Sequence, residues 1–353
     1  MPTTHTLPGR TVELNGKEKL YFSGTSYLGI NHQPEYRALL VEGMQQYGGN
    51  YSSSRSSNLK LAIYEEAEQF IRQWLGQEAV LSFSSGYQAG QALMQVLSTE
   101  ATYIFAPKTH PAVWQSRQKV WQGSYTSWVN SLQEQIAKAP REVIVVSNSL
   151  DPLYAEKYSF DWLAELTEDK SIHVIIDDSH GLGVLGNNGE GIVAEAKAYL
   201  PPYVHLSIVG SIGKALGIPG GIISGSSTLI RQLQKSPYYT AASPIPPPYL
   251  FAFLQAQPIY QRARLNMQKR IRQFVNEVDT LNLFHYFENY PVFYTPYNAL
   301  TQAVEELGIL SSFPYPQPDS APVTRVVLNA LHTEKDIEML SKAVKQFANT
   351  RGA

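Results

Sequence analysis

The stretch Leu206-Ser-Ile-Val209-Gly210-Ser211-Ile212-Gly213-Lys214-Ala215-Leu216-Gly217 runs from a short apolar segment to a lysine flanked by small residues. Five more β-prone runs occur elsewhere in the chain, alternating with stretches of helical spacing: 79–83, 102–105, 143–146, 173–176 and 221–224. Apolar strands that alternate with helices are what a parallel sheet covered on both faces requires. The sequence therefore predicts an α/β fold with a mostly parallel sheet.

The lysine of this stretch is unusual for its surroundings. Partial desolvation after a buried strand would lower the pKa of Lys214, and its small neighbours would leave room for a bulky adduct on its nitrogen. The alternative is a solvated loop lysine, which is the commoner case.

Asp177 directly follows the run 173–176, so its carboxylate is expected at the carboxyl end of a strand, where open α/β sheets bind ligands. The alternative is a capping or turn aspartate, with His180 as a turn histidine. Gly181-Leu-Gly183-Val-Leu-Gly186 has the glycine spacing of a dinucleotide-binding fingerprint. Its glycines do not follow the strand directly and lead into turn residues, so a nicotinamide site is not predicted.

Ser84-Ser85-Gly86-Tyr87 lies between the run 79–83 and a helical stretch. Small residues at such a junction expose backbone N–H groups at a helix N-terminus, where a phosphate binds well. Alone this signal is weak. A phosphate cradle, a strand-end carboxylate and a small-flanked lysine, in this order, are together the parts needed to hold pyridoxal phosphate (PLP).

The composition excludes several other chemistries. The chain has 353 residues, 28 basic and 30 acidic side chains, and no Cys. It therefore has no disulfide, no Cys-ligated metal and no thiol nucleophile, and it lacks the basic excess of a nucleic-acid binder. No apolar window reaches the length of a membrane span and no signal peptide is recognisable, so a cytoplasmic protein is expected. A charged fraction of 16%, against about 25% on average, suggests a surface covered by another subunit.

Local signals predict the flanking elements. Asn15-Gly16 between two β-prone runs predicts a hairpin, and apolar spacing predicts helices over 35–47 and 61–75. The segment 248–281 is predicted to be one long helix, with room for a bend, and 323–328 a strand. Thr333 is predicted to cap a final helix.

Seven motifs, in order, resemble the α-oxoamine synthases, a family of fold-type I PLP enzymes. They are Ser26-Tyr27-Leu28-Gly29-Ile30 with His32 and Pro34; Tyr47-Gly48-Gly49 to Arg55, with Glu68; Ser85-Gly86-Tyr87-Gln88-Ala89; Lys108-Thr109-His110; Asp177-Asp178-Ser179-His180-Gly181; Gly210 to Ala215; and Arg325 with His332-Thr333. The resemblance implies a large domain with a mostly parallel seven-stranded sheet sandwiched by helices, plus a small α+β C-terminal domain. It gives an N-terminal arm and helix (1–45), a PLP-binding domain (46–256), a small domain (257–353), and a homodimer with shared active sites.

The resemblance also implies roles for single residues. Lys214 would form the Schiff base with PLP, Asp177 would pair with the pyridine nitrogen, His110 would stack on the ring, and His180 would lie near the ring hydroxyl. The other expected contacts to PLP are Ser85, Gly86, Tyr87, Asn148, Ser211 and, from a neighbouring subunit, Thr240 or Ser243. Arg325 would bind the substrate carboxylate, and Tyr27 and Arg55 are further substrate-binding candidates; no metal site is expected.

The expected reaction is the decarboxylative or deprotonative condensation of a small amino acid with an acyl-CoA thioester. An aminotransferase or aldolase-like lyase, and a catalytically altered binding subunit, remain open alternatives. The sequence departs from the family at Leu59 and Tyr64 and, when compared without a gap, at Asn148 and Pro152, where a Ser-Met-Asp-Gly turn near the reacting centre is lost. A comparison with a gap pairs Ser149-Leu-Asp151 with Ser-Met-Asp, but the ungapped one is preferred. The segment after 283 is also short for the family, so the amino acid and the acyl donor stay open.

Overall fold

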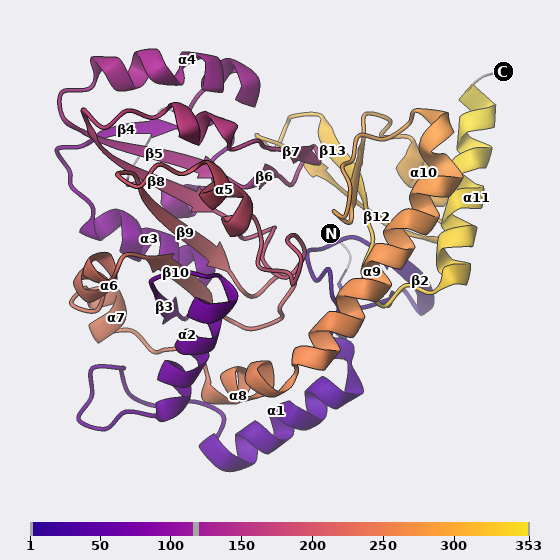
Figure 1. Cartoon of the computed structure of the whole chain (residues 1–353). Helices are drawn as coiled ribbons and strands as arrows, with labels where there is room; N and C mark the ends of the chain where they lie inside the picture. The colour runs from indigo at the N-terminus through magenta and orange to yellow at the C-terminus, as the bar shows by residue number, and fades with distance from the viewer. Residues whose placement is uncertain (1–2, 116–119, 352–353) are drawn as a thin grey trace.

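The computed structural model describes residues 3–115 and 120–351. Its larger sheet has the strand order β3-β10-β9-β8-β5-β4 (Figure 1). The strands are β3 (Ala79–Phe83), β4 (Thr102–Phe105), β5 (Glu142–Asn148), β8 (Ser171–Asp177), β9 (His205–Ser211) and β10 (Gly221–Gly225). β4, β5, β8 and β9 pair in parallel, whereas β10 is antiparallel to both β9 and β3. The expectation of a mostly parallel sheet is confirmed.

The family resemblance implies seven strands in this sheet, which is wrong for the described residues: six strands form it there. β4 lies at the edge. Beyond it, the backbone N–H of Trp121 donates to the carbonyl of Phe105 at 3.3 Å. This contact does not extend into a ladder, so the chain adds no strand here among the described residues.

The two faces of this sheet bury separate apolar clusters. In β5, Val143 and Val145 belong to one cluster, and Ile144 and Val146 to the other, as the two-residue period of a strand requires. The helices that contribute buried side chains to the first cluster include α2 (Ala62–Trp74), α4 (Tyr125–Lys138) and α5 (Val193–Tyr199); those of the second include α3 (Gly86–Val96) and α6 (Ser227–Leu233). The sheet is therefore covered on both faces, as predicted.

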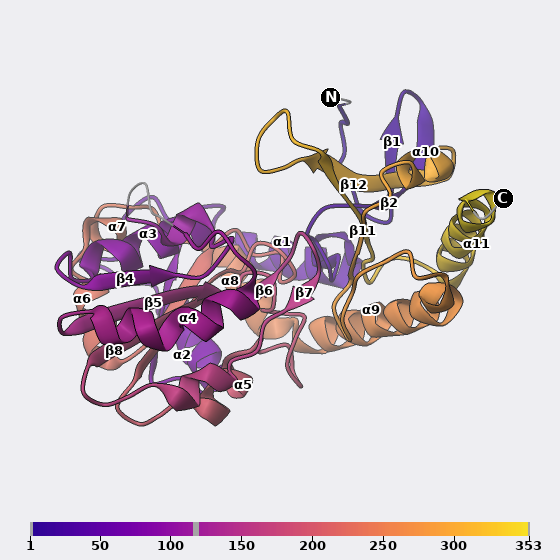
Figure 2. The ribbon, with the colours of Figure 1, turned by 90° about the horizontal axis from the view of Figure 1, so that it is seen from above.

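A second sheet combines the two ends of the chain, in the order β1-β2-β12-β13-β11. Its strands are β1 (Thr11–Leu14), β2 (Lys17–Phe22), β11 (Val292–Thr295), β12 (Gly308–Pro314) and β13 (Pro322–Val327). The predicted hairpin is confirmed: Asn15 and Gly16 both have positive φ, 52° and 73°. β2 pairs in parallel with β12, so the hairpin lies with the C-terminal strands, apart from the larger sheet (Figure 2). The division of the chain into an N-terminal part (1–45), a PLP-binding domain (46–256) and a small domain (257–353) remains a prediction.

The predicted helix over 248–281 is two helices. α8 (Pro247–Gln255) ends at Ala256, and α9 (Gln257–Val278) begins with Pro258 in its first turn. A proline lacks the N–H that would continue the hydrogen bonding of α8, which explains the break. α9 then runs from the larger sheet to the second one (Figure 1), where it is followed by η4 (Asp279–Leu281).

The remaining helices agree with the sequence. α1 (Pro34–Tyr47), α2 and α11 (Glu334–Arg351) confirm three predictions. The Thr333 hydroxyl oxygen accepts the N–H of Asp336, and the Asp336 carboxylate accepts that of Thr333, which forms a capping box. Short elements are η1 (Ile30–His32), η2 (Pro111–Val113), η3 (Asp161–Glu165), α7 (Pro237–Thr240), α10 (Leu300–Val304), β6 (Leu150–Asp151) and β7 (Glu156–Lys157). In the described ranges, no helix combines the length and apolar character that crossing a bilayer needs.

Candidate active site

Three of the predicted residues lie at one edge of the larger sheet. β5 ends at Asn148, β8 at Asp177 and β9 at Ser211. Asn148 is in register with Asp177, and Asp177 with Val209. The carboxyl ends of parallel strands meet at the same edge, where open α/β sheets bind ligands. The strand order thus brings together residues that are far apart in the sequence.

The turn after β8 is tied to the end of β9. The Asp177 carboxylate accepts the N–H of Ser179 at 3.0 Å, and the Ser179 hydroxyl oxygen accepts the N–H of Ser211 at 2.8 Å. Gly183 and Gly186, from the apparent dinucleotide fingerprint, lie in turns with φ near 80°. They do not open a helix, because α5 begins only at Val193.

The N-terminus of α3 lies against the same edge. Ser85 caps this helix, since its hydroxyl oxygen accepts the N–H of Gln88 at 3.0 Å. A Cβ added at Gly86 would lie 2.5 Å from the Cβ of Ser211, so only glycine allows this approach. The first N–H groups of a helix have no partner within it and bind anions. Ser85, Gly86 and Ser211 therefore form a cradle that fits a phosphate, beside an exposed Tyr87.

Lys214, Asp177 and His110 lie close enough to influence one another. Burial lowers the pKa of Lys214, and the Asp177 carboxylate opposes this shift. Burial also lowers the pKa of His110, which Asp177 raises and Lys214 lowers. The Nδ1 of His110 accepts the N–H of Ala112 at 3.1 Å, so a neutral His110 ring carries its proton on Nε2. The structure brings the proposed lysine, carboxylate and stacking histidine together.

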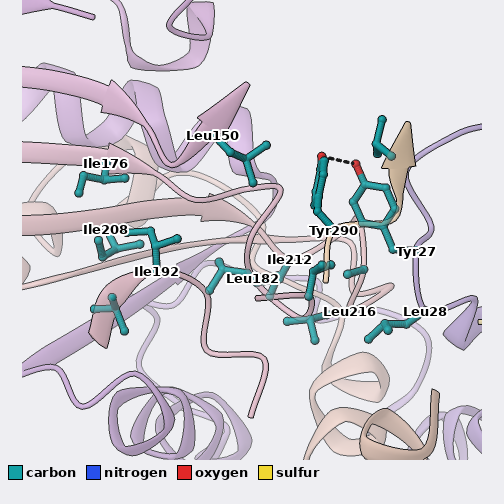
Figure 3. Close-up of a cluster of buried hydrophobic side chains, with 14 of the residues drawn as sticks. Tyr27, Leu28, Leu150, Ile176, Leu182, Ile192, Ile208, Ile212, Leu216 and Tyr290 are labelled. Carbon is teal, nitrogen blue, oxygen red and sulfur yellow. Dashed lines mark hydrogen bonds between the residues drawn. The ribbon is translucent and has the colours of Figure 1, made fainter. Parts of the chain in front are cut away.

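A chain of buried polar side chains supports His180. Its Nδ1 lies 2.8 Å from the Tyr27 hydroxyl. That hydroxyl lies 3.2 Å from the hydroxyl of Tyr290, and Figure 3 shows the two tyrosines. Burial, with Lys214 and Arg325 nearby, holds the pKa of His180 well below its usual value, so the ring is neutral. Burial raises the pKa of both tyrosines, which stay protonated. Sequence reasoning missed Tyr290, because no local motif marks a residue whose partner lies 263 positions away.

Arg325 approaches this group from β13. One of its terminal nitrogens donates to the carbonyl of Pro152 at 2.7 Å and the other to the hydroxyl of Ser311 at 2.9 Å. The residue is 8% exposed, and its Nε is buried without a hydrogen-bond partner among the described residues. Both acceptors are neutral, so the charge of Arg325 is not balanced by them. Ser311, also missed from the sequence, is the cross-strand neighbour of Arg325.

Asn148 and the segment after it correct one expectation. The Asn148 amide donates to the carbonyl of Lys108 at 2.8 Å, while its side-chain oxygen is buried without a partner among the described residues. The motif change at Pro152 predicts loss of the turn, but β6 and β7 still form a hairpin. The Asp151 carboxylate holds this turn by accepting two backbone N–H groups, and Ala155 takes the positive φ of 52° that closes it.

Two predicted site residues are engaged elsewhere. Arg55 forms a buried ion pair with Glu68, and its guanidinium lies 4.7 Å from the ring centre of Tyr64 and 5.1 Å from that of Tyr239. The hydroxyl of Thr240 donates to the carbonyl of Ser236 within its own helix. The substrate contact of Arg55 and the PLP contact of Thr240 stay predictions, and the geometry of Arg55 favours a structural role.

The gathered residues fit PLP. They supply a glycine-dependent phosphate cradle, a carboxylate for the pyridine nitrogen, a partly desolvated lysine and a histidine ring that is partly desolvated but still accessible. Within the described ranges, no cluster of His, Asp and Glu could hold a metal ion.

Comparison with known proteins identifies the family of the chain. The family model for aminotransferase class I and II matches residues 50–344. The 8-amino-7-oxononanoate synthase of Aeromonas hydrophila is 26% identical, over 95% of this chain and 87% of its own length, and that of Petrotoga mobilis is 26% identical over 99% and 93%. Among solved structures, Sphingomonas wittichii serine palmitoyltransferase has a TM-score of 0.84 at 18% identity, covering 99% of this chain and 92% of its own.

The 8-amino-7-oxononanoate synthase of Francisella tularensis gives a TM-score of 0.74 at 20% identity, covering 95% and 99%. These two structures share the fold, and the family match covers most of the chain, including the lysine and carboxylate of the site. The chain therefore belongs to the aminotransferase class I and II family and is a PLP-dependent transferase.

Proposed function

We propose that this enzyme is a C-acyltransferase that condenses a small amino acid with an acyl-CoA thioester and releases CoA and, in the decarboxylative form, CO₂. The observation that carries the amino acid is Arg325, a buried guanidinium whose hydrogen-bond partners among the described residues are neutral, and which, like Lys214, lies near His180. A carboxylate binds such a group strongly. The acyl donor is supported by the 8-amino-7-oxononanoate synthases to which this chain is similar over almost its whole length.

PLP, when bound, supplies an electron sink for the negative charge that develops at the α-carbon of the amino acid. Asp177 is suited to keep the pyridine nitrogen protonated, because a carboxylate favours a nearby positive charge. Arg325 fixes the substrate carboxylate and thereby its orientation. Burial lowers the pKa of Lys214, which favours its taking and returning a proton once its nitrogen is free.

The chain from Tyr290 through Tyr27 orients His180. When the Tyr27 hydroxyl donates to Nδ1, the neutral ring carries its proton on Nε2, which is then the group free to donate to the cofactor ring hydroxyl. His110 is proposed to cover one face of the ring. Ser85, Gly86 and Ser211 are proposed to hold the phosphate, with Tyr87 beside them and Asn148 behind the ring.

We further propose a homodimer in the cytoplasm, where acyl-CoA thioesters are available. Large apolar side chains are exposed on α1, on the loop after it and at the start of α3, where Val41, Leu59 and Tyr87 are 55%, 68% and 58% exposed. A second copy would cover this surface. Thr240 would then reach the phosphate of the neighbouring site.

The test is release of CoA from the PLP-loaded enzyme, measured with a thiol reagent. The chain has no Cys, so the protein gives no background in this assay. We expect CoA release only when a small amino acid and an acyl-CoA are both present. Formation of pyridoxamine phosphate from an amino acid alone would instead support an aminotransferase, and cleavage of a β-hydroxy amino acid would support a lyase.

Lys214→Ala is the matched control. This variant should lose the borohydride-trapped PLP adduct and CoA release together. A protein that stays colourless when PLP is added would contradict every PLP-based function, including the binding-subunit alternative that keeps the cofactor.

A further inference from the structure

A cavity of about 290 Å³, open to one side, lies behind the segment that carries Lys214. It is bordered by the end of α2, the junction of α8 and α9, the loops that follow β8 and β9, and the segment that carries Leu28. Six of the residues that line it are Trp74, Leu216, Phe253, Gln257, Gln261 and Arg264. The aromatic rings make its walls apolar, while the amides and the guanidinium add a few polar groups. This combination is typical of small-molecule sites.

Arg264 is the unusual member. It is 9% exposed and forms no hydrogen bond or ion pair with any residue of 3–115 and 120–351, and its Nη1 is fully buried. Burial lowers the pKa of Arg264, and the charge of Glu190 opposes this. Glu190 nevertheless makes no ion pair with Arg264; its two oxygens accept the backbone N–H groups of Asn187 and Asn188.

A buried guanidinium without a partner is costly, because its desolvation is not offset by hydrogen bonds. The fold could have avoided this cost by exposing the end of the side chain, as Arg262 does when it pairs with Glu35 on the surface two residues earlier. Arg264 instead lies on the wall of a cavity. The guanidinium therefore offers a positive charge to an anion that enters the cavity.

We propose that this cavity binds a small monocarboxylate with an aromatic or apolar body. The single positive charge of Arg264 balances one negative charge, and the nearby Glu190 disfavours a dianion such as a phosphate monoester. Trp74 and Phe253 offer ring surface to the body of the ligand, and Gln257 and Gln261 can bind the second carboxylate oxygen. The volume limits the ligand to roughly the size of a substituted benzoate.

The cavity touches two segments of the candidate active site. Leu28 and Leu216 both line it and lie close together in Figure 3. Leu216 follows Lys214 by two residues, and its carbonyl accepts the hydroxyl of Tyr260, another lining residue, at 2.7 Å. Leu28 follows Tyr27. A ligand in this cavity would thus contact the backs of the segments that hold Lys214 and Tyr27.

The probe is 4-bromobenzoate, added to the PLP-loaded enzyme. We expect calorimetry to detect binding, and the anomalous signal of bromine in a soaked crystal to appear inside the cavity. Arg264→Met should weaken this binding by at least about tenfold, the effect of a lost charge-assisted hydrogen bond. Arg272→Met removes the same charge from the exposed side of α9 and should leave binding unchanged.

Stability separates a ligand site from a structural role. Without the probe, Arg264→Met should be at least as stable to denaturant as the wild type, because it removes an unpartnered buried cation. Arg325→Met tests whether the probe binds in the active site, because this variant should lose such binding and keep binding in the cavity. The proposal is overturned if the wild type shows no binding, if binding is lost in Arg325→Met but kept in Arg264→Met, or if Arg264→Met is clearly destabilised in the absence of the probe.

Discussion

Arg55 and Arg325 are both buried, at 9% and 8% exposure, and the family resemblance assigns both to the substrate. Their surroundings are opposite. Arg55 faces the Glu68 carboxylate and lies between two tyrosine rings, so its charge is balanced inside the protein. Arg325 also lies over an aromatic ring, 5.2 Å from the centre of Phe313, but among the described residues it donates only to a carbonyl and a hydroxyl and its Nε–H has no partner. The comparison indicates that burial alone does not mark a binding arginine. An unbalanced charge does.

Arg325→Met should have the largest effect on catalysis. Loss of the carboxylate contact is expected to lower kcat/KM for the amino acid by about 100- to 1000-fold. The free energy of unfolding should change by less than about 2 kcal/mol, because only two bonds to neutral acceptors are lost. Steady-state kinetics and urea denaturation measure the two effects. A large loss of stability with unchanged kinetics would contradict the assignment.

Arg55→Met should lower the stability of the protein and leave its kinetic constants nearly unchanged. The change leaves the Glu68 carboxylate buried without its cation, which is expected to cost about 3 kcal/mol of unfolding free energy. The kinetic constants of the folded protein should stay within about threefold. The double variant Arg55→Met/Glu68→Leu should recover much of the stability, because it removes both charges. If it recovers none, the ion pair is not the reason for the loss.

Asp178 extends the comparison to a buried carboxylate. It is 0% exposed, and burial raises its pKa to about 7, with no cation paired to it among the described residues. A raised pKa in the folded state contributes stability that is present below the unfolded value of about 3.9 and is lost as the pH rises through 7. The free energy of unfolding of Asp178→Asn, relative to that of the wild type, should therefore rise by up to about 4 kcal/mol as the pH increases from 4 to 8.

Urea denaturation of both proteins at several pH values measures this difference. A difference that stays constant from pH 4 to 8 would show that Asp178 does not titrate in this range.

Ser311→Ala should have the smallest effect. Its hydroxyl accepts one N–H of Arg325, so its loss should raise KM for the amino acid about two- to tenfold with little change in kcat. Ser312→Ala is the matched control, since Ser312 is the next residue of β12 and is exposed on the other face. Equal effects of the two changes would argue against a positioning role for Ser311.

Local chemistry made part of this molecule predictable. Asn15 and Gly16 adopt the positive φ that their turn needs. Pro258 is a local feature of the sequence that accounts for the break between α8 and α9. Lys214 and Asp177 could be found because each follows an apolar strand. The parallel pairing of β2 with β12 could not, because nothing near residue 20 specifies a partner near residue 309.

The site shows the same limit. The sequence motif of Arg55 cannot reveal that Glu68 already balances its charge, since this depends on the packing of α2 against β3. Tyr290 and Ser311 join the site only through tertiary contacts. A turn forms at 152–155 although the family's motif is absent, because the Asp151 carboxylate accepts two backbone N–H groups and Ala155 adopts a positive φ.

The most direct test of the account is a crystal structure of the PLP-loaded enzyme with a small amino acid. We expect PLP bonded to Lys214 or displaced from it by the amino acid, with the substrate carboxylate within about 3 Å of the Arg325 guanidinium. A carboxylate bound at Arg55, or PLP bonded to a different lysine, would contradict it.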